Sequence, residues 1–184
     1  MAPWLWIIIA VVAIIVLYVI VAYNRLVRLT NQADNAWAQI DVQLKRRIDL
    51  IPNLVETVKG YMKHERGTLT EITKARTQLQ QATTVDAKAK ASNMITESLK
   101  TIFAVAENYP KLEASQNFKQ LQEELSATES KIAYSRQAYN DACLSLENAV
   151  ESFPTNMMAN MFSFKKKEMF AASEKEREPV KVKF

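Results

Sequence analysis

The residue types on which most enzyme and metal chemistry depends are scarce in this chain. It contains one histidine, His64, and one cysteine, Cys143. A structural zinc site takes about four Cys or His ligands, and di-iron sites in helical bundles need Glu-x-x-His pairs. One cysteine excludes an internal disulfide, and two glycines are too few for a phosphate-binding loop. The sequence therefore predicts no catalytic residue, no metal site and no cofactor. We expect His64 at a helix surface or end and Cys143 as a small buried residue.

Charged side chains are plentiful but unevenly distributed. Residues 24–66 carry 8 Lys/Arg against 5 Asp/Glu, and residues 165–184 carry 7 against 4, so each segment has a net charge of +3. Residues 111–153 carry 4 against 7, a net charge of −3. These segments form solvated helix faces, or they attract one another or a lipid surface. No dense Lys/Arg run contains interleaved aromatic residues, so nucleic acid is not an expected partner.

A basic cluster, Lys45-Arg46-Arg47, precedes Pro52 in the first of these segments. Two interpretations of the cluster stay open. The arginines pair with carboxylates of the acidic segment, or they dock an acidic partner or lipid.

The C-terminal segment, residues 155–184, differs in composition from the rest. Three methionines and two phenylalanines lie between residues 157 and 164, and three lysines follow at 165–167. Such a cluster suits a membrane interface or a partner groove. Alternatively, these apolar side chains close the open end of a helical domain. The chain ends in Pro-Val-Lys-Val-Lys-Phe, whose alternation is typical of a strand.

An apolar block at residues 4–23 dominates the N-terminal part. It contains no charged residue, and a helix of this length spans roughly 30 Å, about the thickness of bilayer hydrocarbon. Trp4, Trp6, Tyr18 and Tyr23 suit the aromatic belts at the two membrane surfaces. The block is too long for a signal peptide and has no basic segment before it. We therefore expect a retained transmembrane helix.

Two features place this block relative to the rest of the chain. Arg25 and Arg28 follow it directly, and excess Lys/Arg marks the cytoplasmic side, so the N-terminus is expected outside and the following domain in the cytoplasm. No Gly or Pro interrupts residues 4–51, which predicts one helix about 70 Å long that leaves the membrane and continues into water.

Beyond the block, apolar residues recur every three or four positions, as on one face of a helix. One such stripe stays in register across Pro52, which predicts a kink there rather than an end. Whether this helix continues past Gly67 stays open. The stripe consists of Trp37, Ile40, Leu44, Ile48, Ile51, Val55, Val58 and Met62.

Two further helices are expected after a polar turn at residues 78–84. Thr83 and Asp86 have the spacing of a capping box at the start of the first, which should end at 107–110 because Pro110 disfavours a helical residue before it. The second should begin near Ser115 or Asn117 and end at Phe153. The fold class is therefore all-α. The expected organisation is a transmembrane helix (4–23), an antiparallel bundle of three to four helices (24–154) and a flexible or docked tail (155–184).

Five segments are distinctive enough to compare with known families. They are DVQLKRRIDLIPNLVETVKGYMKHE at 41–65, ENYP at 107–110, NFKQLQEEL at 117–125, KIAYSRQAYND at 131–141 and ESFP at 151–154. In this order, behind an N-terminal apolar block, they resemble the bacterial LemA family. Ile48 stands where the family usually has a polar residue, often histidine, so no role of that side chain carries over.

The resemblance implies a single-pass membrane protein with a long helical bundle and no established catalytic activity. Some members are linked with a membrane zinc metalloprotease of the heat-shock type, and one branch with formation of magnetosome membranes. The candidate interaction residues lie in the basic motif, at the corner between the last two helices and in the tail. They are Arg46, Arg47, Asp49, Pro52, Asn53, Asn108, Tyr109, Pro110, Phe162, Lys165, Lys166 and Lys167.

The expected function follows from an anchor, a helical bundle and the lack of a reaction centre. We expect a non-enzymatic scaffold in the bacterial plasma membrane that associates with copies of itself and organises or shapes the bilayer. The alternative is an adaptor that recruits another membrane protein, such as a protease.

Overall fold

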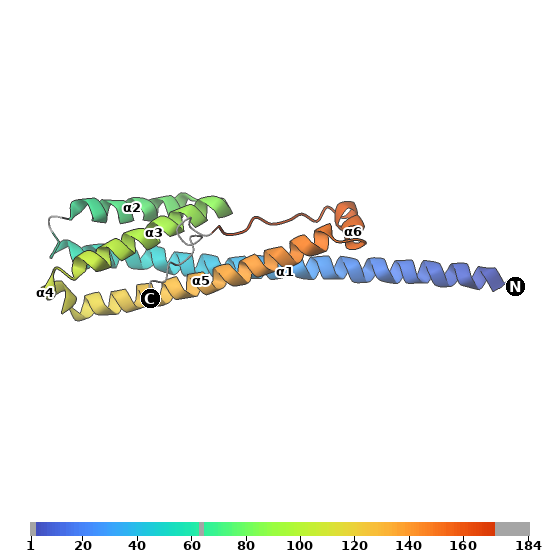
Figure 1. The fold of residues 1–184 in the computed structure, drawn as a ribbon, viewed down its shortest axis with the longest axis horizontal. Coiled ribbons are helices and arrows are strands. Elements are labelled where there is room, and N and C mark those ends of the chain that lie inside the picture. Colours follow the sequence, from blue (N-terminus) through green and yellow to red (C-terminus); the bar gives the residue numbers. More distant parts are fainter. Residues whose placement is uncertain (1–2, 63–64, 172–184) are drawn as a thin grey trace, which may run out of the picture.

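The structure, a computed structural model, describes residues 3–62 and 65–171. These residues form helices joined by turns and contain no strand, so the all-α prediction is confirmed. His64 and the Pro-Val-Lys-Val-Lys-Phe ending lie outside the described residues. The helices are α1 (Pro3–Lys59), α2 (Arg66–Gln81), α3 (Val85–Ala106), α4 (Pro110–Glu113), α5 (Gln116–Glu151) and α6 (Thr155–Met161) (Figure 1).

Helix α1 has 57 residues. Its N-terminal and C-terminal parts have different surroundings. Its N-terminal part projects free of the other helices (Figure 1). Only 6% of its most apolar window is buried, and it is long and apolar enough to cross a membrane. Its C-terminal part packs against α5 and α2. The predicted continuity of the apolar block with the first bundle helix is confirmed, and Pro52 lies inside the helix.

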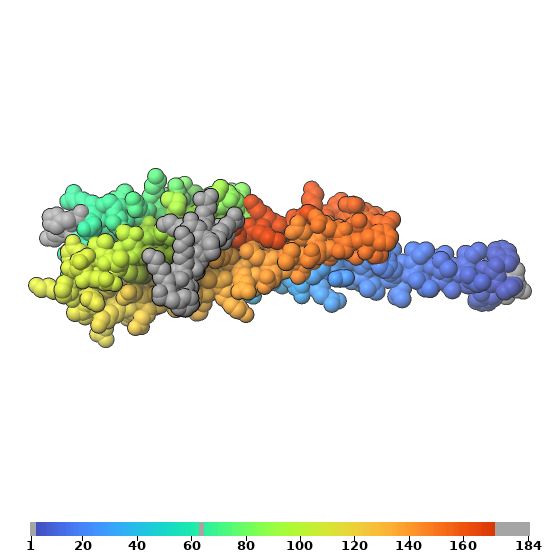
Figure 2. Space-filling model, viewed as in Figure 1, coloured from blue at the N-terminus to red at the C-terminus, as the bar shows by residue number. Residues whose placement is uncertain are grey.

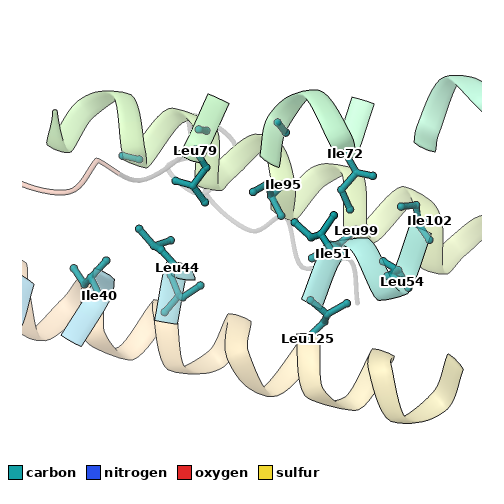
Figure 3. Close-up of a cluster of buried hydrophobic side chains, with 14 of the residues drawn as sticks. Ile40, Leu44, Ile51, Leu54, Ile72, Leu79, Ile95, Leu99, Ile102 and Leu125 are labelled. Atoms are coloured by element: carbon teal, nitrogen blue, oxygen red, sulfur yellow. The ribbon is translucent and has the colours of Figure 1, made fainter. Parts of the chain in front are cut away.

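The bundle consists of the second half of α1 together with α2, α3 and α5. Helix α5 has 36 residues and lies antiparallel to α1 along most of its length, while α2 packs against α3 (Figure 1). Leucine and isoleucine side chains from all four helices meet in the core (Figure 3). Burying such side chains is the main stabilising contribution to a helical bundle, because apolar surface leaves water. The labelled core residues are Ile40, Leu44, Ile51, Leu54, Ile72, Leu79, Ile95, Leu99, Ile102 and Leu125.

Helix boundaries agree with the sequence expectations except at the first two turns. The apolar stripe from residue 37 to 62 outlasts its helix, because α1 ends at Lys59 and Gly67 lies within α2. At the start of α3 the cap is Thr84, whose Oγ1 accepts a hydrogen bond of 3.2 Å from the Ala87 amide. The capping-box spacing had placed this cap one residue early, at Thr83. The expected ends near residues 107 and 115 are confirmed by α3 and α5.

The tail is docked as far as residue 171. Helix α6 lies beside the C-terminal end of α5 and against α1 (Figure 1). There Leu26, Ala149 and Ala159 form a second, small buried cluster, with Leu29, Val150, Met158 and Phe164 packed around it. Farther along, Phe170 enters the main core.

Candidate functional site

The basic motif that precedes Pro52 is divided between the core and the surface. Arg47 is 0% exposed. Its Nη1 donates hydrogen bonds to the Ser92 carbonyl (3.2 Å), to Ser92 Oγ (3.0 Å) and to Thr96 Oγ1 (3.3 Å). Its Nη2 forms an ion pair with Glu129. One guanidinium thus links α1, α3 and α5 inside the bundle.

Burial determines the chemistry of this guanidinium. Loss of water lowers the pKa of Arg47 to about 10, because a low-polarity environment disfavours the charged form. The side chain contacts no open surface, so Arg47 is a core residue and not an accessible interaction residue. Of the two interpretations of the basic cluster, pairing with the acidic helix is the one seen here, since Arg46 also lies 3.7 Å from Glu124.

The other candidates around Pro52 and at the corner are more accessible. Lys45 and Asp49 form an exposed ion pair of 3.1 Å, and Asn53 is exposed beside half-buried Pro52. At the corner, Asn108 and Pro110 are exposed, whereas Tyr109 packs against the core. This corner lies at the end of the bundle farthest from the apolar block (Figure 1).

A groove between α1 and α5 was not expected from the sequence. It has a volume of about 510 Å³. Val42 and Tyr134 line it and are 63% and 75% exposed. Within the described part of the chain, the Gln43 side-chain oxygen in this groove is buried without a hydrogen-bond partner. The lining residues are Ala38, Gln39, Val42, Gln43, Ser130, Lys131, Tyr134 and Ser135.

A larger groove of about 790 Å³ lies between the end of α1 and α2. Its apolar lining is formed by Val55, Met62 and Leu69. Three cationic side chains, Lys59, Arg66 and Lys74, and the threonines at 70, 73 and 77 complete the lining.

The tail candidates are held by specific contacts with the bundle. Lys166 pairs with Glu147 (3.0 Å) and Glu151, and Lys167 lies 2.5 Å from Asp34. Lys165 is exposed. Two of the three lysines therefore fasten the tail to α5 and α1.

Hydrogen bonds continue this attachment along the tail. The Tyr139 hydroxyl donates to the Glu168 carbonyl at 2.7 Å. The Asn140 side chain accepts from the Phe170 amide at 2.9 Å and donates to the Phe170 carbonyl at 3.1 Å. Burial raises the pKa of the Tyr139 hydroxyl above its usual range.

A tight turn reverses the chain between α6 and the docked tail. The Phe164 amide bonds to the Ala159 carbonyl at 2.9 Å and the Ser163 amide to the Asn160 carbonyl at 3.4 Å. This is the Schellman pattern, in which the residue after the cap adopts a left-handed conformation. Ser163 adopts it with φ of 59°, although glycine suits this region better because it lacks a Cβ.

Ser163→Gly is therefore expected to stabilise the chain. The gain is about 0.5–1 kcal/mol, because removing the Cβ relieves the left-handed strain and outweighs the extra freedom of glycine in the unfolded chain. Urea unfolding of the full chain in detergent measures it. Ser152→Gly at the end of α5 is the control, because Ser152 has an extended backbone that gains nothing from glycine. A loss of stability in Ser163→Gly would contradict the prediction.

The expected belt residues lie along the projecting part of α1. Trp4, Trp6, Tyr18 and Tyr23 are all exposed within this chain. Arg25 and Arg28, one turn farther on, are exposed as well.

A LemA family model matches residues 36–184 of this sequence. The chain belongs to the LemA family. A relative, Protein LemA of Metamycoplasma hominis, is 30% identical over 159 residues, which cover 84% of this chain and 71% of the relative. The LemA match includes the four bundle helices and the tail, and it begins after the apolar block.

Inside the LemA-family bundle, the single cysteine is buried, as the sequence predicts. Cys143 is 0% exposed. Burial raises the pKa of its thiol, which lowers the fraction of reactive thiolate. Among the described residues, no group of three or more His, Cys, Asp or Glu side chains could hold a metal ion.

Proposed function

We propose that this LemA-family protein is a non-enzymatic membrane scaffold that associates with copies of itself and organises or shapes the bacterial plasma membrane. One observation carries the proposal: the exposed apolar block continues without a break into the helix that supplies the bundle core. When bundles pack side by side, the continuous helix therefore also fixes the positions of their apolar blocks in the lipid. The exposed arginines after the block favour a cytoplasmic bundle with the N-terminus outside.

The α1–α5 groove is the surface proposed for self-association. It combines an exposed valine and an exposed tyrosine. Tyrosine is enriched in protein interfaces. Because the groove runs between two long helices, a second bundle can pack alongside it with both apolar blocks in the same bilayer.

The test is the mass of the full chain extracted in native lipid nanodiscs. We expect integer multiples of 21.0 kDa, and we expect Val42→Glu with Tyr134→Glu to reduce them to single chains. Met94→Glu is the matched control, because Met94 is an exposed apolar residue on α3 outside the groove. If nanodiscs extracted from the native membrane contain only single copies of the wild-type chain, self-association is refuted.

The alternative function, an adaptor for another membrane protein, is favoured by the groove between α1 and α2. Its apolar lining and three cations suit an acidic, partly apolar segment of a partner. The same mass measurement separates the two functions. An adaptor gives one copy of this chain plus a mass that is no multiple of 21.0 kDa, and the double variant at residues 42 and 134 leaves that complex intact.

A further inference from the structure

Helix α6 lies at the level where the apolar block of α1 ends (Figure 1). Tyr23 is the last residue of this block, and its ring lies edge-on to Phe162 at 4.9 Å and to Phe164 at 5.7 Å. Ala22 and Leu26 are 4% and 0% exposed, because the α5–α6 region covers this turn of α1. In Figure 2 the end of α5 and α6, in orange, reach the base of the projecting blue helix. The tail therefore contacts the point where α1 leaves the block.

The outer side of this region carries four large apolar side chains, with Ser152, Asn160 and Ser163 also exposed. Phe153, Met157, Met161 and Phe162 are between 45% and 79% exposed. Residues 152–164 contain no charged side chain. On the inner side of α6, Thr155 and Ala159 are buried against the bundle, and among the described residues the Asn156 side-chain oxygen is buried without a hydrogen-bond partner. We call the four exposed residues the α6 patch.

Charges around the α6 patch are arranged as at a membrane surface. The carboxylate of Glu151, at the end of α5, is paired with Lys166, which reduces the penalty for bringing it near lipid. Asp34, paired with Lys167, lies 11 residues past Tyr23 along α1, roughly 16 Å deeper into the water at helical rise. Arg25 and Arg28 follow Tyr23 along α1, are exposed and suit anionic headgroups.

We propose that the α6 patch lies in the headgroup–acyl boundary of the bilayer and forms a second membrane contact beside the α1 span. Lipid is favoured over a protein partner because the patch is continuous with the apolar block through the Tyr23 contacts. Phenylalanine and methionine partition into this boundary without needing polar partners. The inference rests on the proposed membrane insertion of residues 4–23.

A second contact on one side of α1 changes what the anchor does. A single transmembrane helix leaves tilt and rotation to its interfacial residues and packing. With the α6 patch also in the interface, one face of the bundle always points the same way relative to the membrane plane. The long axis of the bundle is then held at a set angle to the bilayer.

Spin labels on the full chain in vesicles of phosphatidylethanolamine and phosphatidylglycerol test this inference. Labels go on Met157→Cys and Met161→Cys, with Ile14→Cys as the reference inside the block and Met94→Cys as the reference in water. The native Cys143 is fully buried, so it does not compete for the label. We expect the ratio of collisions with oxygen to collisions with a water-soluble nickel chelate at 157 and 161 to be several-fold above that at 94.

The outcomes distinguish failure of the second membrane contact from failure of the α1 span. A ratio at 157 and 161 equal to that at 94 places the patch in water and overturns the inference. Low collision rates with both reagents mean that protein, such as a second copy, covers the patch, and this also overturns it. A nickel-accessible label at position 14 refutes the span itself and, with it, the anchored scaffold.

Discussion

Glu129→Ala is expected to destabilise the bundle by about 3 kcal/mol, whereas Arg47→Met should change its stability by less than about 1 kcal/mol. The two partners of this ion pair differ in exposure. The Arg47 side chain is 0% exposed and that of Glu129 is 39% exposed. Removing Glu129 leaves a charged guanidinium in the core with only neutral acceptors. Removing Arg47 leaves a carboxylate on a partly exposed side chain, whose Oε1 still accepts a hydrogen bond of 3.0 Å from the Thr96 hydroxyl.

A double-mutant cycle measures this asymmetry. In the Arg47→Met background, Glu129→Ala should lose less than about 1 kcal/mol, which gives a coupling of about 2 kcal/mol. Urea unfolding in detergent, followed by far-UV circular dichroism, provides each value. Glu124→Ala is the matched control: Glu124 lies on the same helix, but its partner Arg46 is 50% exposed, so the loss should be less than about 1 kcal/mol. Equal losses for Glu124→Ala and Glu129→Ala would contradict the argument.

The position of Arg47 shows where helical periodicity is ambiguous. From Ile40 onward, the buried residues of α1 form a row with alternating spacings of four and three: Ile40, Leu44, Arg47, Ile51, Leu54 and Val58. The apolar stripe read from the sequence shares four of these positions but substitutes Ile48 for Arg47 and Val55 for Leu54. A charge at one position moved the inferred face by one residue. The spacing of three and four residues is compatible with the true core row. Because Arg47 is charged, the apolar pattern placed Ile48 in that row instead.

On helix α5, the expectation that Cys143 is a small buried residue is confirmed. Cys143 is 0% exposed and belongs to the main core, whereas its neighbour Ala142 is half-buried. The fold class, the continuity of α1 and most helix ends follow from local signals, so they were predictable.

The candidate surfaces depend on contacts between distant segments. Val42 and Tyr134 are isolated apolar residues in their own helices, and they share a groove only because α1 and α5 pack antiparallel. Similarly, the α6 patch is a candidate membrane contact because Phe162 packs against Tyr23, which lies more than a hundred residues earlier in the chain. No local pattern encodes such proximity. The methionine and phenylalanine cluster indicated both alternatives considered for the tail: part of it packs on the bundle and part is exposed.

Phe170→Ala is expected to lower the stability of the chain by about 3 kcal/mol and to release the tail. Phe170 is 1% exposed and belongs to the main core, with its ring 6.2 Å from that of Trp37. Truncation removes this ring and leaves a cavity that the flanking helices fill only partly. The two hydrogen bonds between Asn140 and the Phe170 backbone remain possible, but each contributes only about 1 kcal/mol.

Limited trypsin digestion measures release of the tail directly. In the wild type, Lys166 and Lys167 are paired with α5 and α1, so cleavage at residues 165–167 requires undocking. In Phe170→Ala this cleavage should be at least tenfold faster, because a loss of 1.4 kcal/mol already shifts an equilibrium tenfold. Met169→Ala is the control, since Met169 is exposed at the neighbouring position and should leave the rate unchanged. If both variants are cleaved at the wild-type rate, Phe170 does not hold the tail, and the lysine pairs with Glu147 and Asp34 suffice to keep α6 beside the end of the apolar block.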